Sequence, residues 1–439
     1  MLNSMAAVRS GRAENLHRHG VLCTSDLYRS DSIGRLSTPL EAMLGNYRAA
    51  DSLWIGKPFD ARNNSLNLIR LIFAVAVLVH HAWPLSGTEN SPSFAGDTLG
   101  GWAVAGFFVI SGYLITHSRF THSLGDYLVH RIARIVPAFV VCLIVVAAVF
   151  APIGYAKANG SLDGFFGTGT TPFNYVFTNL GLRMNAYDVA GTPAAVPYAG
   201  VWNGSLWSIY FEFCCYIIVA FIGLFALVRK SPWPITVLFV LSVAANVAMT
   251  RIAPYAQGNY EFTMLMHLLP FFLGGALVYV WKHRIGIHWV PAVLSLAAAA
   301  VLTALFPTWG GGASGAFIAY GLLWISLWLP SPQLVKKNDV SYGIYIYAFP
   351  VQQLLALYGL HERGLPAYII IAGVLTFLPA ICSWIWLERP IMRAVRRAGK
   401  AAAPHAAVPE PSAGPAAPLM PAATADGFPE TPAAAAAQA

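Results

Sequence analysis

An arginine and a histidine, Arg70 and His81, lie eleven residues apart within one long apolar segment of this chain. In an α-helix, eleven steps of ~100° return to within about 20° of the starting direction, so both side chains share one face. They are separated by roughly 16 Å along the axis, about half the hydrocarbon thickness of a bilayer. Such a histidine can act as a general base and such an arginine can bind an anion. The structural alternative is that Arg70 extends to the interface and His81 caps the helix near Pro84.

A carboxylate in a second apolar segment is a candidate partner for this histidine. Ser208, Glu212 and Tyr216 share one helix face by their i, i+4 spacing. Counted from the outer ends of their segments, Glu212 and His81 are expected at similar depth. A carboxylate beside a histidine fixes its tautomer and raises its basicity, which predicts a Glu212–His81 pair. A structural ion pair of Glu212 with another polar group is the alternative.

Arginines near the inner ends of the segments form a third candidate group. Arg131 and Arg134 lie three residues apart on one face before Pro137. Together with Arg70 they could make a cationic site for phosphate groups. The bias of positive charge toward the cytoplasm would also place two arginines here. Glu388 is expected to make a local ion pair with Arg389.

Other reactive side chains carry weaker signals. His267, near the outer end of a further segment, is either a core histidine or a second group at an acceptor site. The remaining histidines show no ligand spacing with a carboxylate or cysteine, so no metal site is expected. The sequence also has neither a glycine-rich phosphate loop nor a serine nucleophile elbow.

The composition shows what kind of fold must position these groups. Of 439 residues, 57% are hydrophobic and only 10% are charged, whereas soluble domains are about a quarter charged. Five cysteines are too few for a disulfide scaffold, and the apolar content excludes disorder over most of the length. These numbers predict an all-α, polytopic membrane helical bundle.

Apolar runs of about 20 residues predict ten transmembrane helices. The second is short and glycine-rich and could be re-entrant. Residues 1–62 are expected to form a polar cytoplasmic leader, 63–393 the membrane domain, and 394–439 a disordered Ala/Pro-rich cytoplasmic tail. The ten segments lie near residues 66–86, 101–117, 134–155, 205–228, 233–250, 262–282, 288–306, 312–329, 340–359 and 366–388.

The positive charges orient these segments. With the N-terminus inside, 22 of the 27 Lys and Arg residues fall on one side, which predicts that both termini are cytoplasmic. This topology accounts for the net charge of +8, so no nucleic-acid partner is expected. On the outside, the long segment 156–204 has little charge and many Gly, Asn and Thr residues. It suits a neutral polar ligand such as a glycan, and an inert lid is the alternative.

Six blocks in this order resemble the acyltransferase-3 family of integral membrane proteins, over roughly residues 63–393. The family moves acyl groups, commonly acetyl, from coenzyme A to glycans and other envelope molecules. Two departures are visible: Asn67 stands where the family often has Asp, and Ala348 where many members have His. The blocks are the Arg70…His81 spacing, FFVISGYLIT at 107–116, RIARIVP at 131–137, Trp207-Ser208 with Glu212, SYGIY at 341–345 and LERP at 387–390.

The residues and the resemblance together imply a membrane-bound O-acyltransferase in the inner (cytoplasmic) membrane. Acyl-CoA, most simply acetyl-CoA, would be the donor substrate, with no permanently bound cofactor, and its phosphates would contact Arg70, Arg131 and Arg134. His81 would act as general base or as a covalent acyl carrier, with Glu212 and Arg70 in the same catalytic group. The acceptor, an extracytoplasmic or lipid-linked glycan such as O-antigen or exopolysaccharide, is expected to contact Trp207, Ser208, Tyr210 and His267.

One rival function and one question of assembly remain open from the sequence. A secondary transporter or exporter of a small polar or acylated molecule would also have about ten spans and buried charges. Against it, the sequence shows no inverted repeat of broken helices and no midplane carboxylate pair. A homodimer is possible.

Overall fold

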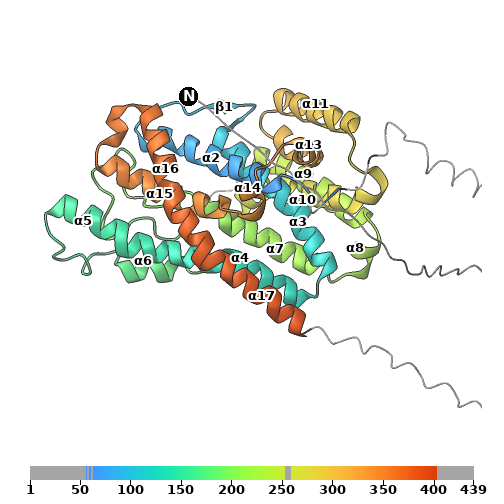
Figure 1. Ribbon diagram of the computed structural model, residues 1–439. Coiled ribbons are helices and arrows are strands. Elements are labelled where there is room, and N and C mark those ends of the chain that lie inside the picture. Colours follow the sequence, from blue (N-terminus) through green and yellow to red (C-terminus); the bar gives the residue numbers. More distant parts are fainter. Residues whose placement is uncertain (1–55, 57–58, 61–62, 253–258, 403–439) are drawn as a thin grey trace, which may run out of the picture. The chain divides into compact units, whose positions relative to one another are not determined.

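The computed structural model describes residues 56, 59–60, 63–252 and 259–402, all within one unit, Leu53–Ala439. Most of the predicted leader and the tail after Ala402 lie outside the described residues. The described part is almost entirely helical (Figure 1). Within it, the single sheet pairs β1 (Ser93–Phe94) with β2 (Asp97–Thr98) as an antiparallel hairpin.

Among the residues that the structure describes, five helical stretches are long and apolar enough to cross a membrane. Two of them pass through a π-helical turn without a break, so each contains three elements. Three stretches are single helices: α2 (Leu66–Leu85), α3 (Leu99–Thr121) and α10 (Tyr260–Ile285). The stretch Leu124–Asn159 consists of α4 (Leu124–Val145), η1 (Val146–Phe150) and α5 (Ala151–Asn159). The stretch Leu365–Gly399 consists of α16 (Leu365–Ser383), η3 (Trp384–Glu388) and most of α17 (Arg389–Ala402).

Shorter helices complete the described part. Apolar helices of intermediate length are α7 (Trp207–Ile222), α9 (Trp233–Ile252), α11 (Trp289–Leu305), α13 (Gly315–Trp328) and α15 (Ser341–Leu357). The remaining helical elements are α6 (Pro172–Asn179), α8 (Ala226–Lys230), α12 (Gly310–Ala313), α14 (Gln333–Lys337) and the 3-10 turn η2 (Leu360–Arg363).

Each of the ten predicted segments overlaps a helix of the described part, with four differences in extent. The third stretch begins at Leu124 instead of near residue 134 and ends at Asn159. The second segment is not short: α3 has 23 residues and meets the length needed to span. The fourth is shorter than predicted, because α7 ends at Ile222 after 16 residues. The tail is not disordered from residue 394, since α17 continues to Ala402.

Small residues let α3 pack closely against α10. A Cβ at Gly112 would lie 1.8 Å from the carbonyl oxygen of Phe272, and one at Gly275 would lie 2.0 Å from that of Val109. Glycine is therefore required at both positions, as is common where membrane helices cross closely. The sequence block at 107–116 thus has a packing role, and it brings Ser111 of α3 toward the interior of the bundle.

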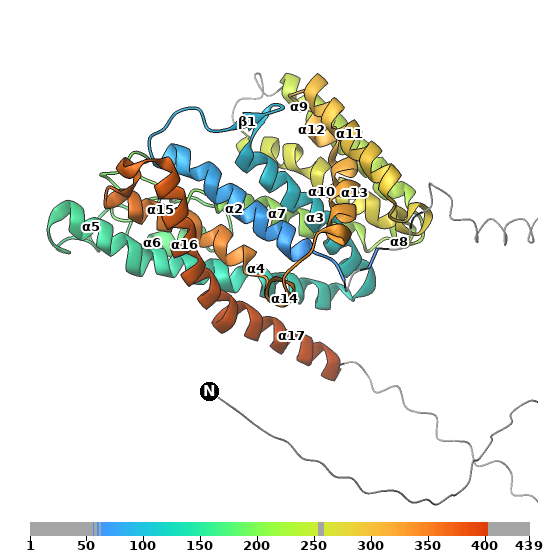
Figure 2. The ribbon, with the colours of Figure 1, turned by 45° about the horizontal axis from the view of Figure 1, so that its top comes forward.

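Helix α15 is the most enclosed of the intermediate helices, with all but two of its residues buried. It packs between α2 and α16 and contacts α4. Figures 1 and 2 show α16 continuing through η3 into α17 as one long helix that passes beside α4. This arrangement gathers the start of α15, the first half of α4, the start of α2 and α17 around one region.

Candidate active site

A cationic pocket opens where α2, α3, α4, α14 and α17 meet. Its volume is about 590 Å³, within the range of small-molecule sites. Among the described residues that line it, only Asp339 is acidic. The basic lining residues are Arg70, His130, Arg131, Arg134, Lys336, Lys337, Arg389, Arg393 and Arg396. An excess of cations this large around one cavity suits a ligand with several negative charges.

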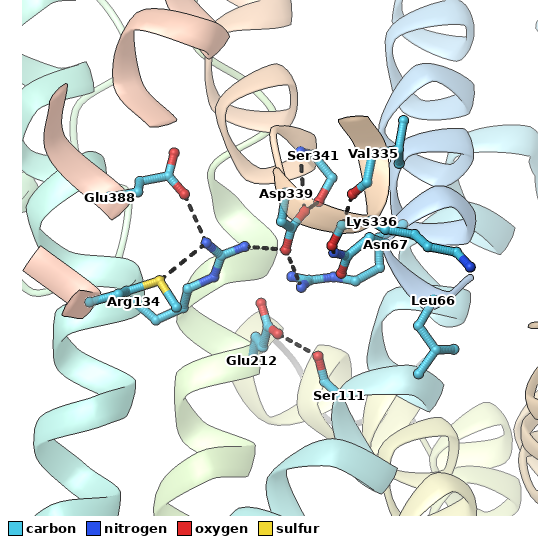
Figure 3. A network of polar contacts seen from close by, with 12 residues as sticks. Leu66, Asn67, Ser111, Arg134, Glu212, Val335, Lys336, Asp339, Ser341 and Glu388 are labelled. Atoms are coloured by element: carbon cyan, nitrogen blue, oxygen red, sulfur yellow. Dashed lines mark hydrogen bonds and ion pairs between the residues drawn. The ribbon is translucent and has the colours of Figure 1, made fainter. Parts of the chain in front are cut away.

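Asp339 joins two of the predicted arginines from different helices (Figure 3). Its Oδ2 accepts from Arg70 Nη1 of α2 at 2.7 Å and from Arg134 Nη2 of α4 at 2.6 Å. Its Oδ1 accepts from the backbone N–H and hydroxyl of Ser341, at the start of α15. The carboxylate therefore fixes three helices relative to one another through charge-assisted hydrogen bonds.

The charge of Asp339 is maintained by these partners. Burial by itself would raise the pKa of this carboxyl, but Arg70, Arg134 and the hydrogen bonds from Ser341 outweigh burial and lower the pKa to about 2. Asp339 is therefore ionised at neutral pH.

Arg134 is held by a second carboxylate as well. Its Nη1 donates to Glu388 Oε2 of η3 at 2.9 Å, and the Ser383 hydroxyl donates to Glu388 Oε1 at 3.0 Å. The prediction of a local Glu388–Arg389 pair is wrong, because η3 turns Glu388 inward against α4. With two carboxylates, Arg134 is largely neutralised before any ligand binds.

Arg131 differs from its neighbours in having no such partner. In the described part of the chain, its guanidinium makes no hydrogen bond or ion pair, and its buried Nε has no acceptor. A guanidinium that is partly buried in a pocket without a partner is costly unless a ligand supplies one. Of the three predicted arginines, Arg131 is thus the one with a full charge available to an anion.

A narrow slot leads inward from the pocket, and Arg70 lines both. Its volume is only about 30 Å³, and its walls include Phe107, Phe108 and Tyr345. The rings of Phe107 and Tyr345 meet edge to face at 5.8 Å, which keeps the slot narrow. Its apolar walls suit an apolar chain rather than a charged group.

Glu212 lies between the pocket and the slot. Its Oε1 accepts from the Ser111 hydroxyl at 2.7 Å and from the Tyr216 hydroxyl at 2.6 Å. Figure 3 shows the Glu212–Ser111 contact beside the arginine network. Ser111 and Tyr216 also line the pocket, so Glu212 orders two hydroxyls at its inner end.

His81 lies further along the bundle, with different neighbours. Its ring packs edge to face on Phe349 of α15 at 5.1 Å and beside His80 at 5.5 Å. The buried Nδ1 of His81 has no hydrogen-bond partner within the described residues. The predicted Glu212–His81 pair is therefore wrong: each side chain contacts other groups, because α7 turns Glu212 toward α3 instead of α2.

The four predicted acceptor residues do not form one cluster. Ser208 lines the slot and hydrogen-bonds to the Tyr345 hydroxyl. Trp207 and Tyr210 pack instead on Phe211, away from the slot. The fourth, His267, lies beside Asp97 of the β1–β2 hairpin.

His267 is not enclosed in the core. Its side chain is 39% exposed, and Nε2 lies 3.9 Å from Asp97 Oδ2 of the β1–β2 hairpin. The ring packs on Phe271. The structural alternative of a satisfied core histidine does not fit this exposure. Over residues 63–252 and 259–402, no three or more His, Cys, Asp or Glu side chains gather where a metal ion could bind.

Asp339 is the site residue that the sequence reasoning missed. The signal was present: an acid stands two residues after Lys337 and two residues before the block that begins at Ser341. Asn67, where the family often has Asp, donates to the carbonyl groups of Val335 and Lys336 at 3.4 and 3.2 Å. The carboxylate beside Arg70 thus comes from Asp339.

The model of the acyltransferase-3 family, described as an acyltransferase domain, matches residues 63–385. The chain belongs to the acyltransferase-3 family. It is a multi-pass membrane acyltransferase, and no solved structure matches it. The family match contains Arg70, His81, Arg131, Arg134 and Asp339, but it ends before α17 begins.

Two curated proteins are similar to this acyltransferase over most of their lengths. A Shigella phage Sf6 protein named O-acetyl transferase is 29% identical over 337 residues, covering 75% of this chain and 96% of the relative. Nodulation protein 10 of Rhizobium leguminosarum bv. viciae is 26% identical over 376 residues, covering 76% of this chain and 94% of the relative.

Proposed function

We propose that this acyltransferase moves an acyl group, most simply acetyl, from cytoplasmic acyl-CoA to a hydroxyl of an extracytoplasmic or lipid-linked glycan. The observation that carries the proposal is the cationic pocket joined to an apolar slot at Arg70. Acyl-CoA has the same two parts, a phosphate-rich nucleotide and a long uncharged arm. The phage relative named an O-acetyl transferase supports acetyl as the group and oxygen as its acceptor.

The donor phosphates would bind in the pocket. Arg131 would contact the diphosphate directly, because its guanidinium has no partner in the described part of the protein. Arg70 and Arg134, held by Asp339, would add donors in fixed positions. Preorganised donors lower the cost of ordering when the ligand binds.

The pantetheine arm would extend into the slot toward His81. Entry requires the ring of Phe107 or Tyr345 to rotate, since the slot is too narrow for the arm. Tyr345 and Phe349 lie one turn apart on α15, and Phe349 contacts His81, so the slot points toward this histidine.

His81 would act as general base in the transfer itself. Its imidazole takes the proton of the acceptor hydroxyl while the oxygen attacks the thioester carbonyl carbon. The C–S bond then breaks, the acyl group stays on the acceptor oxygen, and the CoA thiolate takes the proton from the His81 imidazolium, which restores the neutral base. Glu212 would position the Ser111 and Tyr216 hydroxyls at the inner end of the arm.

The proposal includes a topology in the inner (cytoplasmic) membrane. The domain 63–393 would cross ten times, with the leader 1–62 and the segment after 393 in the cytoplasm. Support comes from the overlap of every predicted segment with an apolar helix. The pocket, rich in Lys and Arg, would then open to the cytoplasm, where acyl-CoA is found.

Acceptor-dependent thioester cleavage tests this function. Membranes that contain the protein are expected to release CoA from acetyl-CoA only when a glycan acceptor is added, measured by thiol titration and by mass spectrometry of the glycan. Membranes with His81→Ala are the control. CoA release without any acylated glycan, or transport of the glycan without acylation, would contradict the proposal.

Arg131→Gln is expected to raise the KM for acetyl-CoA by about 10- to 100-fold, because a hydrogen bond to a charged group contributes about 1.5 to 3 kcal/mol. The thermal unfolding temperature should change little, since Arg131 has no ion partner to lose. Arg284→Gln, an exposed basic residue outside the pocket lining, is the matched control and should keep the wild-type KM. An unchanged KM in Arg131→Gln would refute the phosphate contact.

A further inference from the structure

We infer that α17 supplies a recognition site for the 3′-phosphate of coenzyme A, formed by Arg393 and Arg396. The inference rests on the proposed function, because it assumes that acyl-CoA occupies the cationic pocket. It goes beyond that function because it names the phosphate that is bound, the residues that bind it and the helix that carries them. The consequence is selectivity for coenzyme A over donors that lack this phosphate.

The first observation is the position of α17 beyond the family match. The match ends at residue 385, and α17 begins at Arg389. Even so, α17 forms one wall of the pocket with Arg389, Met392, Arg393, Val395 and Arg396. The three arginines repeat at i, i+4 and i+7, which places them on one helix face. Figure 2 shows this helix as the continuation of α16 beside α4.

The second observation is a gradient of burial along the pocket. Arg134 is only 11% exposed and Arg70 is 21% exposed, whereas Arg393 and Arg396 are exposed at the surface. The thioester must lie deepest, because the slot begins at Arg70. The diphosphate follows the pantetheine arm, and the 3′-phosphate is carried on the ribose beyond it. The order of the chemical groups along acyl-CoA therefore places the 3′-phosphate beside the outermost arginines, Arg393 and Arg396.

The third observation concerns free charge. Arg70 already pairs with Asp339, and Arg134 pairs with Asp339 and Glu388, but Arg393 and Arg396 make no hydrogen bond or ion pair within the described residues. A phosphate monoester carries about −1.5 to −2 at pH 7 and accepts from several donors at once. Two arginines on one helix face match such a dianion by paired, charge-assisted hydrogen bonds.

A comparison of two donors tests the site in the full-length protein. KM and kcat are measured for acetyl-CoA and for 3′-dephospho-acetyl-CoA, first in neutral detergent. Each exposed Arg–phosphate pair is expected to strengthen donor binding by a factor of about three. The double variant Arg393→Gln/Arg396→Gln should therefore raise the KM for acetyl-CoA about tenfold. Its KM for the dephospho donor and its kcat should stay at wild-type values. The double variant Arg393→Lys/Arg396→Lys should recover part of the lost affinity for acetyl-CoA.

Arg397→Gln is the matched control. This arginine is exposed on the same helix but does not line the pocket, so its KM for both donors should equal that of the wild type. Equal rises for both donors in the double variant, or no rise for either, would overturn the inference. An effect seen only in vesicles with anionic lipid would also overturn it, because the arginines would then bind lipid head groups. A wild-type protein that cleaves neither donor would refute the proposed function itself.

Discussion

His81→Ala is expected to lower kcat for acyl transfer by about 10²- to 10⁴-fold, the usual contribution of a positioned general base. In the proposed reaction the acyl group reaches His81, whose ring packs against Phe349 and whose buried Nδ1 has no hydrogen-bond partner among the described residues. The KM for acetyl-CoA should change little, since no phosphate contact is lost.

The matched control for this prediction is the neighbouring histidine. His80→Ala removes an adjacent imidazole that packs against Gly100, outside the lining of the pocket and the slot. It should keep kcat within a few-fold of the wild type. Activity is measured as acetylated glycan per amount of folded protein in the membrane.

Two outcomes separate the mechanisms. Wild-type kcat in His81→Ala would exclude the general-base role. A burst of CoA release by the wild type before any acceptor is added would indicate a covalent acyl-enzyme instead of direct transfer.

Asp339→Asn is expected to reduce the free energy of unfolding by about 2 to 3 kcal/mol. The change leaves two arginines beside a neutral amide in a buried position, and removing one partner of a buried pair is strongly destabilising. Removing one partner of a buried pair usually costs about 3 to 5 kcal/mol, and we expect a smaller loss here because Arg134 keeps Glu388. The KM for acetyl-CoA should also rise, because Arg70 and Arg134 lose their fixed positions.

The pH dependence of stability checks the same carboxylate. The pKa of Asp339 is lowered from 3.8 to about 2 in the folded state, so its stabilising contribution is fully present above about pH 4. It is lost as the pH falls from about 4 to about 2, when the carboxylate takes up a proton. Asp339→Asn should therefore differ from the wild type at neutral pH and approach it near pH 2.

Unfolding is followed by circular dichroism in mixed micelles, with Asp163→Asn as the control. Asp163 is exposed, and its carboxylate accepts a local hydrogen bond from the Ser161 hydroxyl, so its substitution should leave stability within about 0.5 kcal/mol. An equal effect of the two substitutions would show that Asp339 does not hold the arginines together.

Much of the helical framework could be predicted from local properties of the chain. The length of each apolar run and the 3.6-residue period depend only on neighbouring residues, so each of the ten predicted segments overlaps a helix, although several ends differ. The same reasoning placed Arg131 and Arg134 in one pocket with Arg70. The few charged residues within apolar segments strongly indicate functional sites, because charged groups within a membrane are costly.

The partners of these residues depended on tertiary structure. The prediction of a Glu212–His81 pair used only the depth of the two residues in the membrane. The rotation of α7 about its axis, which is set by packing against α3, instead brings Glu212 into hydrogen-bond contact with Ser111. Asp339 meets arginines more than 200 positions away in the chain, a contact that no local pattern encodes. Composition and periodicity therefore determine that this chain is a membrane helical bundle with a few buried polar groups. Only the packing of the helices decides which of those groups meet, because each helix can rotate about its axis without changing its own sequence pattern.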